Sequence, residues 1–499
     1  MPGLEAVDHI VVVMLENRSF DHMLGFLYKK TGQFDGLAGT ESNLDPDGNK
    51  VTVFKITAGT QNYQWFPLAN PAEGYEATHA QVFGAPVPPG PPDAKNDGFV
   101  TSFANELQNP AHPADPKLAG AAPSSIMAMN TADTLPVLSA LAKSYAVCDG
   151  WCASVPTETL PNRAFALAGT SGGSVVNKGT FPLETSVFGK LSETNIGWKV
   201  YGYAGLPKTP SDFKDATNPN GIGQSFAEFR QDAANGALAS FVFLEPQWAD
   251  YQRKPPEHSW DLEDDQHPVS NLAHGERLIF DVYQALRSSP TWNQTLLIIT
   301  YDEHGGCYDH VPPPTTAISP DGIVGPSGFE FTRFGVRVPT VLVSPLIPPG
   351  TILNAPADGP PFDHTSILAT LRARFGIGAL TKRDAAAPDV GGVLTLAEPR
   401  DDNPMDAVSP LAPVEAVLAD GSTAATGVGA PSKAPTSVLV AQAQLSAALD
   451  VPGDPIDDPE AAVDALPNTA AVHFAFIQRR LRGFYGRADR EPHRRATNP

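Results

Sequence analysis

Two strongly apolar segments, each ending in polar side chains, constrain the fold of this chain more than any other feature. They cover residues 10–15 and 295–301. Such β-branched runs, bounded by polar and glycine-rich residues, predict strands that are buried on both faces of a sheet. Each run leads directly into hard oxygen ligands: Glu16, Asn17, Asp302 and Glu303.

These polar strand ends predict a metal site. Open α/β sheets bind ligands in the crevice beyond the carboxyl ends of their strands, and carboxylate and amide oxygens suit a hard divalent cation. The alternative is that the acids are solvated loop residues or helix N-caps, the commoner role of a single acidic strand end. We favour a metal because two such ends occur, each with a His nearby. Oxygen ligands favour Ca, Mg or Mn, while Zn and Fe stay open.

Helical periodicity alternates with further apolar runs along the chain. This alternation predicts an α/β fold in which helices cover both faces of a parallel or mixed sheet. Further strands are expected over residues 147–151, 198–203, 241–245 and 336–345. Helices are expected over residues 20–28, 76–83, 99–107, 135–147, 274–287 and 364–375, with another after Thr159.

The composition predicts many long loops, because the chain has 50 Pro and 43 Gly residues. Long loops around a rigid sheet usually carry the site. We expect a catalytic domain over residues 1–384, with a lid-like excursion over the site at residues 31–125. Residues 385–468, rich in Ala, Pro and Asp, predict an irregular arm. Residues 469–499 predict a last helix over 470–485 and a basic tail.

Charge and cysteine content exclude several classes of protein. A formal net charge of −21 argues against nucleic acid or anionic lipid as a high-affinity partner. Three cysteines, Cys148, Cys152 and Cys307, do not form a disulfide framework and are expected to be buried free thiols.

No apolar run is long enough for a transmembrane helix. No cleavable leader fits before the first strand, so we expect a cytoplasmic protein, or one exported by a signal-less route or after trimming. The oligomeric state stays open.

Thr159 is the candidate nucleophile because it stands just before a predicted helix with Pro161 in its first turn. A helix N-terminus offers positive dipole and free N–H groups to an oxyanion. Arg163, one turn further on, can place its guanidinium on phosphate oxygens. A plain N-cap is the alternative role for Thr159, and Thr157 competes for either role. With a hard cation nearby, the expected chemistry is phosphoryl or acyl hydrolysis.

A rival motif lies between Gly169 and Gly173. It fits the G-x-S-x-G pattern of serine esterases, which would make Ser171 the nucleophile of a carboxylesterase. That motif needs a strand before the serine and a helix after it. Here a helix-like run precedes the serine and a strand-like stretch follows, so we expect the glycine-rich end of a helix instead.

Several histidines near acids or strand ends are candidate phosphate contacts or general acids. Each one alone is more often a structural or surface residue. The candidates are His79, His267, His304, His310 and His364.

Five segments, in order along the chain, resemble the sequence blocks of the bacterial phosphoesterase family. That family contains the phosphatidylcholine-type phospholipases C and related acid phosphatases. The segments lie at residues 8–22, 154–163, 301–312, 334–339 and 362–366, and contain ENRSFDH, TLPNR, DEHGG, GVRVP and FDHTS.

The resemblance implies an alkaline-phosphatase-like core, a three-layer α/β/α sandwich with a central mixed, mostly parallel sheet. It implies one divalent metal ion and a phosphothreonine intermediate on Thr159. The implied metal ligands are Glu16, Asn17, Thr159, Asp302 and Glu303. The implied phosphate contacts and proton donors are His79, His267, His304 and His364, to which we add Arg163 and His310 as expected substrate contacts.

The expected function is that of a metal-dependent, phospholipase C-like phosphoesterase acting on a small-molecule or phospholipid phosphate ester. An acid phosphatase built on the same site is the alternative. One departure from the family concerns substrate choice, because Thr157-Glu158 replaces the usual Gly-Pro and adds a carboxylate near an anionic substrate. The aromatic residues Tyr63, Trp65 and Phe66 either hold a choline-like cation or pack within a loop, and we favour loop packing.

Overall fold

The computed structural model describes residues 3–84, 94–109, 117–177, 183–203, 207–223, 225–248 and 263–418, together with residues 421 and 423. All of them belong to one compact unit. Within this part of the chain, no helix combines the length and apolarity needed to cross a bilayer. Cys148, Cys152 and Cys307 are buried free thiols, as the sequence predicts.

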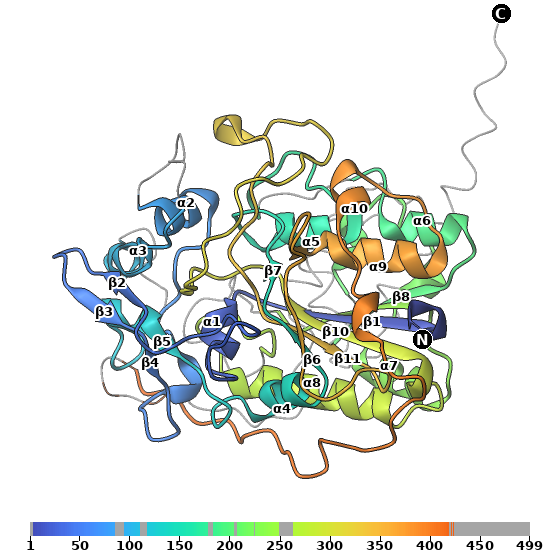
Figure 1. Cartoon of the computed structure of the whole chain (residues 1–499), viewed down its shortest axis with the longest axis horizontal. Helices are drawn as coiled ribbons and strands as arrows, with labels where there is room; N and C mark the ends of the chain where they lie inside the picture. The colour runs from blue at the N-terminus through green and yellow to red at the C-terminus, as the bar shows by residue number, and fades with distance from the viewer. Residues whose placement is uncertain are drawn as a thin grey trace, which may run out of the picture. The chain divides into compact units, whose positions relative to one another are not determined.

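A seven-stranded sheet forms the centre of the unit (Figure 1). Its strands are β1 (His9–Leu15), β6 (Ala146–Cys148), β8 (Trp198–Gly202), β9 (Phe241–Glu245), β10 (Thr295–Tyr301), β11 (Thr340–Val343) and β12 (Thr351–Leu353). The order across the sheet is β12-β6-β11-β10-β1-β9-β8. Only β11 runs antiparallel to its neighbours; every other pair is parallel. The predicted mixed, mostly parallel sheet is therefore confirmed.

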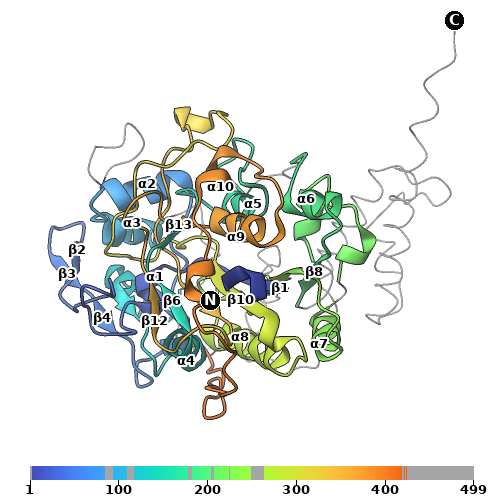
Figure 2. The same ribbon diagram turned by 45° about the vertical axis from the view of Figure 1, so that its right-hand side comes forward.

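Helices cover both faces of this sheet (Figures 1 and 2). They are α4 (Pro136–Ser144), α5 (Thr159–Ala168), α6 (Val187–Glu193), α7 (Phe226–Ala234), α8 (Leu272–Arg287), α9 (Thr365–Phe375) and α10 (Lys382–Ala386). Helices α4, α7 and α8 pack together on one face, and α5, α6, α9 and α10 on the other. All of β10, and all of β1 except His9, is buried between these layers. The three-layer α/β/α sandwich explains why both strands read as unbroken apolar runs.

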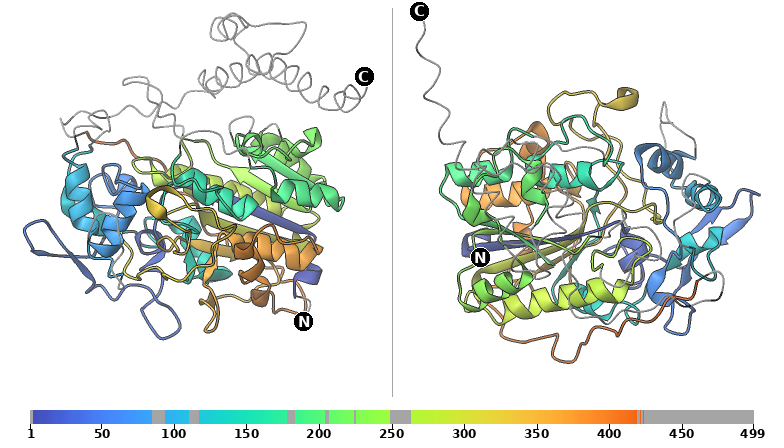
Figure 3. Two further views of the ribbon diagram at one scale, coloured as in Figure 1. Left: turned by 90° about the horizontal axis from the view of Figure 1, so that it is seen from above. Right: turned by 180° about the vertical axis from the view of Figure 1, so that it is seen from behind.

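The excursion between α1 (Phe20–Leu24) and α4 folds as small elements beside the carboxyl ends of β1 and β10 (Figure 3). They are β2 (Ser42–Leu44), β3 (Lys50–Thr52), β4 (Phe54–Lys55), α2 (Tyr75–Phe83), α3 (Phe99–Glu106) and β5 (Ala128–Met129). Elsewhere β7 (Trp151–Cys152) pairs with β13 (Phe362–Asp363). Two apolar clusters, to which later segments also contribute, stabilise the excursion, and one of them contains Trp65 and Phe66.

Several elements are shorter than their sequence patterns predict. The helix expected over residues 20–28 ends at Leu24, because the chain turns at Gly25, whose carbonyl accepts a hydrogen bond from the Leu37 amide at 2.7 Å. The strand expected over 336–345 shortens to β11 because prolines flank it and proline has no N–H for the ladder.

The segment after α10 is irregular up to residue 418, apart from a short 3-10 helix at Gly391–Val393. The remainder of the expected arm, the helix expected over 470–485 and the basic tail lie outside the described residues. The domain boundaries drawn from the sequence therefore remain predictions.

Candidate active site at the carboxyl edge of the sheet

The carboxyl ends of β1 and β10 lie side by side. Leu15 pairs with Tyr301 in the parallel register, so Glu16 and Asp302 leave the sheet as neighbours. Asn17 then adopts a left-handed conformation with φ of 57°. The chain after β10 passes so close that a Cβ on Gly305 would lie 2.1 Å from the Asn17 carbonyl oxygen. Only glycine permits this approach, which gives the first glycine of DEHGG a structural reason.

Asp302 is the centre of a buried hydrogen-bond network. Its Oδ1 accepts the backbone N–H groups of Asn17 at 3.0 Å and of Glu303 at 2.7 Å. Its Oδ2 accepts Arg163 Nε at 3.1 Å, and Arg163 Nη2 lies 3.4 Å from Glu16 Oε1. The structure thus joins two predicted carboxylate ligands and the predicted phosphate-binding arginine in one cluster.

Thr159 is the first residue of α5, so the helix begins one position earlier than the sequence predicts. The turn before it is fixed by Asn162, whose Nδ2 donates to the carbonyls of Val155 and Thr157 at 3.1 and 2.9 Å. The Thr159 hydroxyl donates to Asn17 Oδ1 at 3.3 Å. Thr157 is turned away and donates to the Val175 carbonyl at 2.6 Å. Of the two candidate threonines, Thr159 is the one that faces the acidic cluster.

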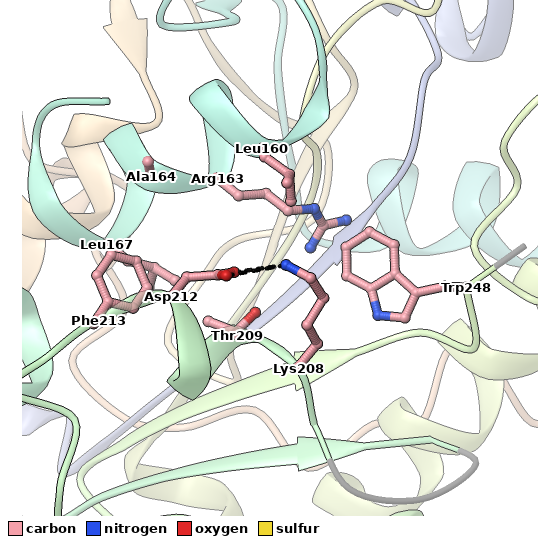
Figure 4. A pocket seen from close by; sticks show the side chains of 9 residues that line it. All are labelled: Leu160, Arg163, Ala164, Leu167, Lys208, Thr209, Asp212, Phe213 and Trp248. Atoms are coloured by element: carbon pink, nitrogen blue, oxygen red, sulfur yellow. Dashed lines mark hydrogen bonds and ion pairs between the residues drawn. The ribbon is translucent and has the colours of Figure 1, made fainter. Parts of the chain in front are cut away.

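Arg163, which contacts the acidic cluster, also lines a neighbouring pocket (Figure 4). One face of α5 lines this pocket, and the guanidinium of Arg163 stacks on the indole of Trp248 at 4.2 Å from the ring centroid. Lys208 and Asp212 form an ion pair there at 2.9 Å. Among the described residues, Arg163 Nη1 is buried and has no hydrogen-bond partner. One guanidinium nitrogen, Nη1, therefore remains for a ligand, while Nε and Nη2 hold the strand ends.

Glu73, which no sequence motif marks, belongs to the same cluster. It lies just before α2 in the excursion, accepts a hydrogen bond from Asn17 Nδ2, and lies 3.4 Å from His267 Nε2. Because an ionised carboxylate can only accept, Glu73 fixes which end of the Asn17 amide faces it. The oxygen end therefore faces Thr159, which is the orientation a metal ligand requires.

Replacing Glu73 with Gln is expected to leave the Asn17 side-chain amide free to face either way, because a Gln side chain can both accept and donate hydrogen bonds. We expect divalent-cation affinity to fall by about 10- to 100-fold, the usual effect of removing a group that orients a metal ligand. Isothermal titration with Ca²⁺, Mg²⁺, Mn²⁺ and Zn²⁺ measures the change. Glu76→Gln, at an exposed position on the next turn, is the matched control. Equal affinities in the two variants would contradict the role of Glu73.

His267, His304 and His364 all adjoin the cluster but differ in protonation. Burial opposes the charge on His267, yet the hydrogen bond and charge of Glu73 outweigh it and raise the pKa to about 10. Burial lowers the pKa of His304 to about 3 and that of His364 to about 4. His267 is thus a cation near neutral pH, whereas the other two rings are neutral.

The two neutral histidines hold neighbouring groups in place. His304 Nε2 donates to Gln81 Oε1 at 2.7 Å, which ties DEHGG to α2. His364 Nδ1 accepts from Trp151 Nε1 at 3.2 Å, so its Nε2 carries the hydrogen and donates to the Asp302 carbonyl at 2.5 Å. Both ring nitrogens of His364 are therefore engaged, and its predicted contact with phosphate stays a prediction.

His79 and His310 are not joined to this network by any contact of the described residues. His79 lies on α2 with its Nδ1 3.2 Å from Arg333 Nη1. His310 Nδ1 lies 2.6 Å from Asp21 Oδ2, and its Nε2 lies 3.2 Å from Asp35 Oδ1. With both ring nitrogens engaged by neighbours, His310 supports a second acidic cluster instead of the one at the strand ends.

By distance alone, that second cluster could hold a metal ion. Asp21, Asp309 and His310 offer three ligand atoms within 4.8 Å of one another. However, Arg337 already lies among them, with Nη2 3.2 Å from Asp21 and Nε 3.0 Å from Asp309. The guanidinium supplies the positive charge that a metal would supply. We therefore interpret the group as a buried ion-pair network that fixes the start of α1.

His310 is expected to make stability depend on pH. Burial opposes its charge, but hydrogen bonds to Asp21 and Asp35 outweigh burial and raise the pKa to about 9 from 6.5. Because the pKa of His310 is higher in the folded than in the unfolded protein, protonation of this side chain stabilises the fold. The stabilisation is fully present below pH 6.5 and is lost as pH rises through 9. We expect His310 to contribute about 2 kcal/mol to the free energy of unfolding at low pH. This is less than the full pKa shift implies, because its partner Asp35 is half-exposed and solvent weakens their interaction. Urea unfolding of wild type and His310→Gln at pH 6 and 9.5 measures this contribution as the difference between their free energies of unfolding. A difference that is as large at pH 9.5 as at pH 6 would contradict the role of His310.

Ser171 does not have the surroundings of an esterase nucleophile. It follows the left-handed Gly169 that ends α5, and its hydroxyl donates to the Ser174 carbonyl at 2.6 Å. A nucleophile elbow requires a strand before the serine and a helix after it. The predicted glycine-rich helix end is what the structure contains.

The strand-end cluster fits a divalent cation. Burial, followed by the charge of Asp302, raises the pKa of Glu16. Burial, followed by the charges of Glu73 and Asp302, raises the pKa of Glu303, whose Oε1 is buried without a partner among the described residues. Excess negative charge and an orphaned carboxylate oxygen are what a bound cation would neutralise and coordinate. The oxygen-only donor set is typical of hard cations.

A buried cluster of oxygen ligands at the carboxyl edge of a doubly covered sheet, facing a threonine at the start of a helix, defines a candidate metal-assisted hydrolase. The chain belongs to the phosphoesterase family, whose sequence model matches residues 7–378. The predicted family resemblance is thereby confirmed.

Similar proteins of known name are phospholipases C. Non-specific phospholipase C5 from Arabidopsis thaliana is 37% identical over 421 residues, which are 81% of this chain and 77% of that protein. Phospholipase C B from Mycobacterium tuberculosis is 30% identical over 80% of each chain. These names confirm the predicted class, a hydrolase of phosphoric ester bonds. The similar proteins are plant as well as bacterial.

Two of the solved structures that are similar to this chain cover just over half of it. A protein of the alkaline phosphatase superfamily from Vibrio parahaemolyticus is 15% identical with a TM-score of 0.31, covering 51% of this chain and 64% of that chain. The lipoteichoic acid synthase of Listeria monocytogenes is 12% identical with a TM-score of 0.32, covering 58% and 80%. The three-layer architecture therefore rests on the strand order and helix packing described above.

Proposed function

We propose that the chain is a metal-dependent phosphodiesterase of the phospholipase C type that works through a phosphothreonine on Thr159. The observation that carries this proposal is the Thr159 hydroxyl at the N-terminus of α5, 3.3 Å from Asn17 Oδ1 in the acidic cluster. Membership of the phosphoesterase family and the names of the similar proteins support it. The helix N-terminus adds free N–H groups and positive dipole where phosphate oxygens would lie.

The reaction divides into two displacements at phosphorus. In the first, Thr159 Oγ1 loses its proton and forms a bond to phosphorus, while the bond from phosphorus to the diacylglycerol oxygen breaks and that oxygen takes up a proton. In the second, a water oxygen forms a bond to phosphorus and the bond from phosphorus to Thr159 Oγ1 breaks. One proton of the water returns to Oγ1, and the phosphorylated head group leaves. A covalent intermediate splits one difficult step into two easier ones. A divalent cation held by Glu16, Asn17, Thr159, Asp302 and Glu303 would neutralise charge on the phosphate.

His267 is the best-placed proton donor among the predicted histidines. The pKa of about 10 keeps it protonated at neutral pH, whereas His304 and His364 are neutral. Its Nε2 faces Glu73 Oε2 at 3.4 Å, a long contact that a phosphate oxygen or leaving alkoxide could replace. Arg163 Nη1, buried without a partner among the described residues, is a second donor to phosphate.

The decisive experiment compares hydrolysis of p-nitrophenylphosphorylcholine and p-nitrophenylphosphate, before and after chelation and with metal added back. Cleavage of the diester that is lost on chelation and restored by metal supports the proposal. Cleavage of the monoester alone indicates an acid phosphatase on the same site. Turnover of p-nitrophenyl acetate that chelation leaves unchanged, with neither phosphate ester cleaved, would overturn the proposal in favour of an esterase.

A further inference from the structure

We propose that the pocket around Arg333 and His79 binds an anionic group of the substrate's head group, so that the enzyme favours phospholipids whose head group carries an additional anion over those whose head group does not. This inference rests on the proposed function and extends it to the class of lipid. The pocket is lined by Tyr75, Thr78, His79, Val82, Phe83, Pro156, Pro313, Pro314, Thr315, Arg333 and Phe334. Pro156 lies three residues before Thr159, so the pocket adjoins the segment that carries the nucleophile.

Arg333 gives this pocket a positive charge that no acid neutralises. Its Nη2 donates to the Tyr75 hydroxyl at 2.6 Å and its Nη1 to His79 Nδ1 at 3.2 Å. Neither partner carries a negative charge, and within the described ranges no carboxylate pairs with Arg333. The chain as a whole carries a net charge of −21, so the positive charge of this pocket is opposite in sign to the net charge of the protein. An anion is the ligand that would complete its interactions.

His79 adds a hydrogen-bond donor that has no acceptor. Because a guanidinium can only donate, His79 Nδ1 must accept from Arg333, and the hydrogen of the neutral ring is therefore on Nε2. Burial and the charge of Arg333 lower the pKa of His79 to about 4, which keeps the ring neutral. The side chain is 3% exposed, and Nε2 has no partner among the residues that the structure describes. A buried N–H of this kind is costly unless a ligand oxygen accepts it.

Arg333 also fills the place that a choline cation would need. Its guanidinium lies over the rings of Tyr75, Phe83 and Phe329, at 5.8, 5.5 and 5.3 Å from their centroids. Recognition of a quaternary ammonium requires such ring faces to be open.

The aromatic residues considered from the sequence offer no substitute. Trp65 is 1% exposed and donates to the Val414 carbonyl at 3.1 Å, and Phe66 is buried beside it. The loop-packing interpretation of these residues is thus the one that the structure supports. The charge and the donors of the Arg333 pocket favour a head group that carries an anion.

The test compares two lipids that differ by one carboxylate, phosphatidylserine and phosphatidylethanolamine, in mixed micelles with the metal-loaded enzyme. We expect wild type to show a kcat/KM ratio of about tenfold or more in favour of phosphatidylserine. Arg333→Met should bring this ratio close to one by lowering the value for phosphatidylserine alone. Arg333→Lys, which keeps the charge, should retain part of the preference. Arg230→Met, at an exposed position, is the matched control.

The outcomes separate failure of this inference from failure of the proposed function. Equal cleavage of both lipids by wild type, or an equal loss for both in Arg333→Met, overturns the pocket's role while the phospholipase assignment stands. If neither lipid is cleaved, the proposed function fails. Titration of the wild-type protein with O-phosphoserine and phosphoethanolamine then decides the pocket on its own. Tighter binding of phosphoserine that Arg333→Met abolishes supports the pocket, and equal binding overturns it.

Discussion

Replacing Thr159 with Ala is expected to lower kcat by about 10³-fold or more while leaving the fold intact. Loss of a nucleophile removes the covalent route altogether, and what remains is catalysis by positioning and charge. The cost in stability is expected to stay near 1 kcal/mol, because the hydroxyl makes one hydrogen bond, to Asn17 at 3.3 Å. Steady-state kinetics and thermal unfolding of the same preparation measure both quantities.

Thr157→Ala is the matched control for this variant. Thr157 lies two residues earlier, is equally buried, and donates to the Val175 carbonyl instead of facing the acidic cluster. It should lose some stability and keep its activity. Thr159→Ser should retain a measurable rate, since it keeps the hydroxyl. Wild-type rates in Thr159→Ala would show that Thr159 is only a helix-start residue.

Replacing Asp302 with Asn is expected to abolish metal binding and activity together. Asp302 holds the backbone of Asn17 and Glu303 and the side chain of Arg163, so its loss removes one ligand and disorganises the others. We expect divalent-cation affinity to fall by about 100-fold or more. Isothermal titration gives the affinity, and metal analysis before and after chelation gives the occupancy.

Asp309→Asn distinguishes the two acidic clusters. Asp309 belongs to the network with Asp21, His310 and Arg337, which offers ligand atoms at suitable spacing but already contains a cation. We expect this variant to lose stability and to keep its metal affinity. The reverse pattern, with metal lost in Asp309→Asn and kept in Asp302→Asn, would move the metal site to the second cluster.

Local sequence patterns were sufficient for the parts of the fold that depend on neighbours in the chain. The apolar runs before Glu16 and Asp302 have the bounds of β1 and β10 almost to the residue. Because parallel strands present their carboxyl ends at one edge, the same pattern also predicts that these acids meet, and the paired register of Leu15 and Tyr301 brings them together. The helix that begins at Thr159 follows from Pro161 in its first turn.

Histidines show where the local pattern stops being informative. His267, His304 and His310 look alike in sequence, because each lies within two residues of an acid. In the structure one is a cation held by Glu73, one is a neutral donor to Gln81, and one braces an ion-pair network away from the candidate nucleophile. The sign of each pKa shift depends on burial and on partners far away in the chain, which no spacing rule contains.

The sequence by itself determined the three-layer architecture, the family and the two acidic strand ends, because each depends on periodicity or on contiguous motifs. The tertiary structure alone decided that Glu73 orients the Asn17 amide, that Thr157 is turned away, and that Arg333 gives His79 its tautomer. These contacts join segments separated by 56, 18 and 254 positions. They exist only because tertiary packing brings these groups within hydrogen-bonding distance.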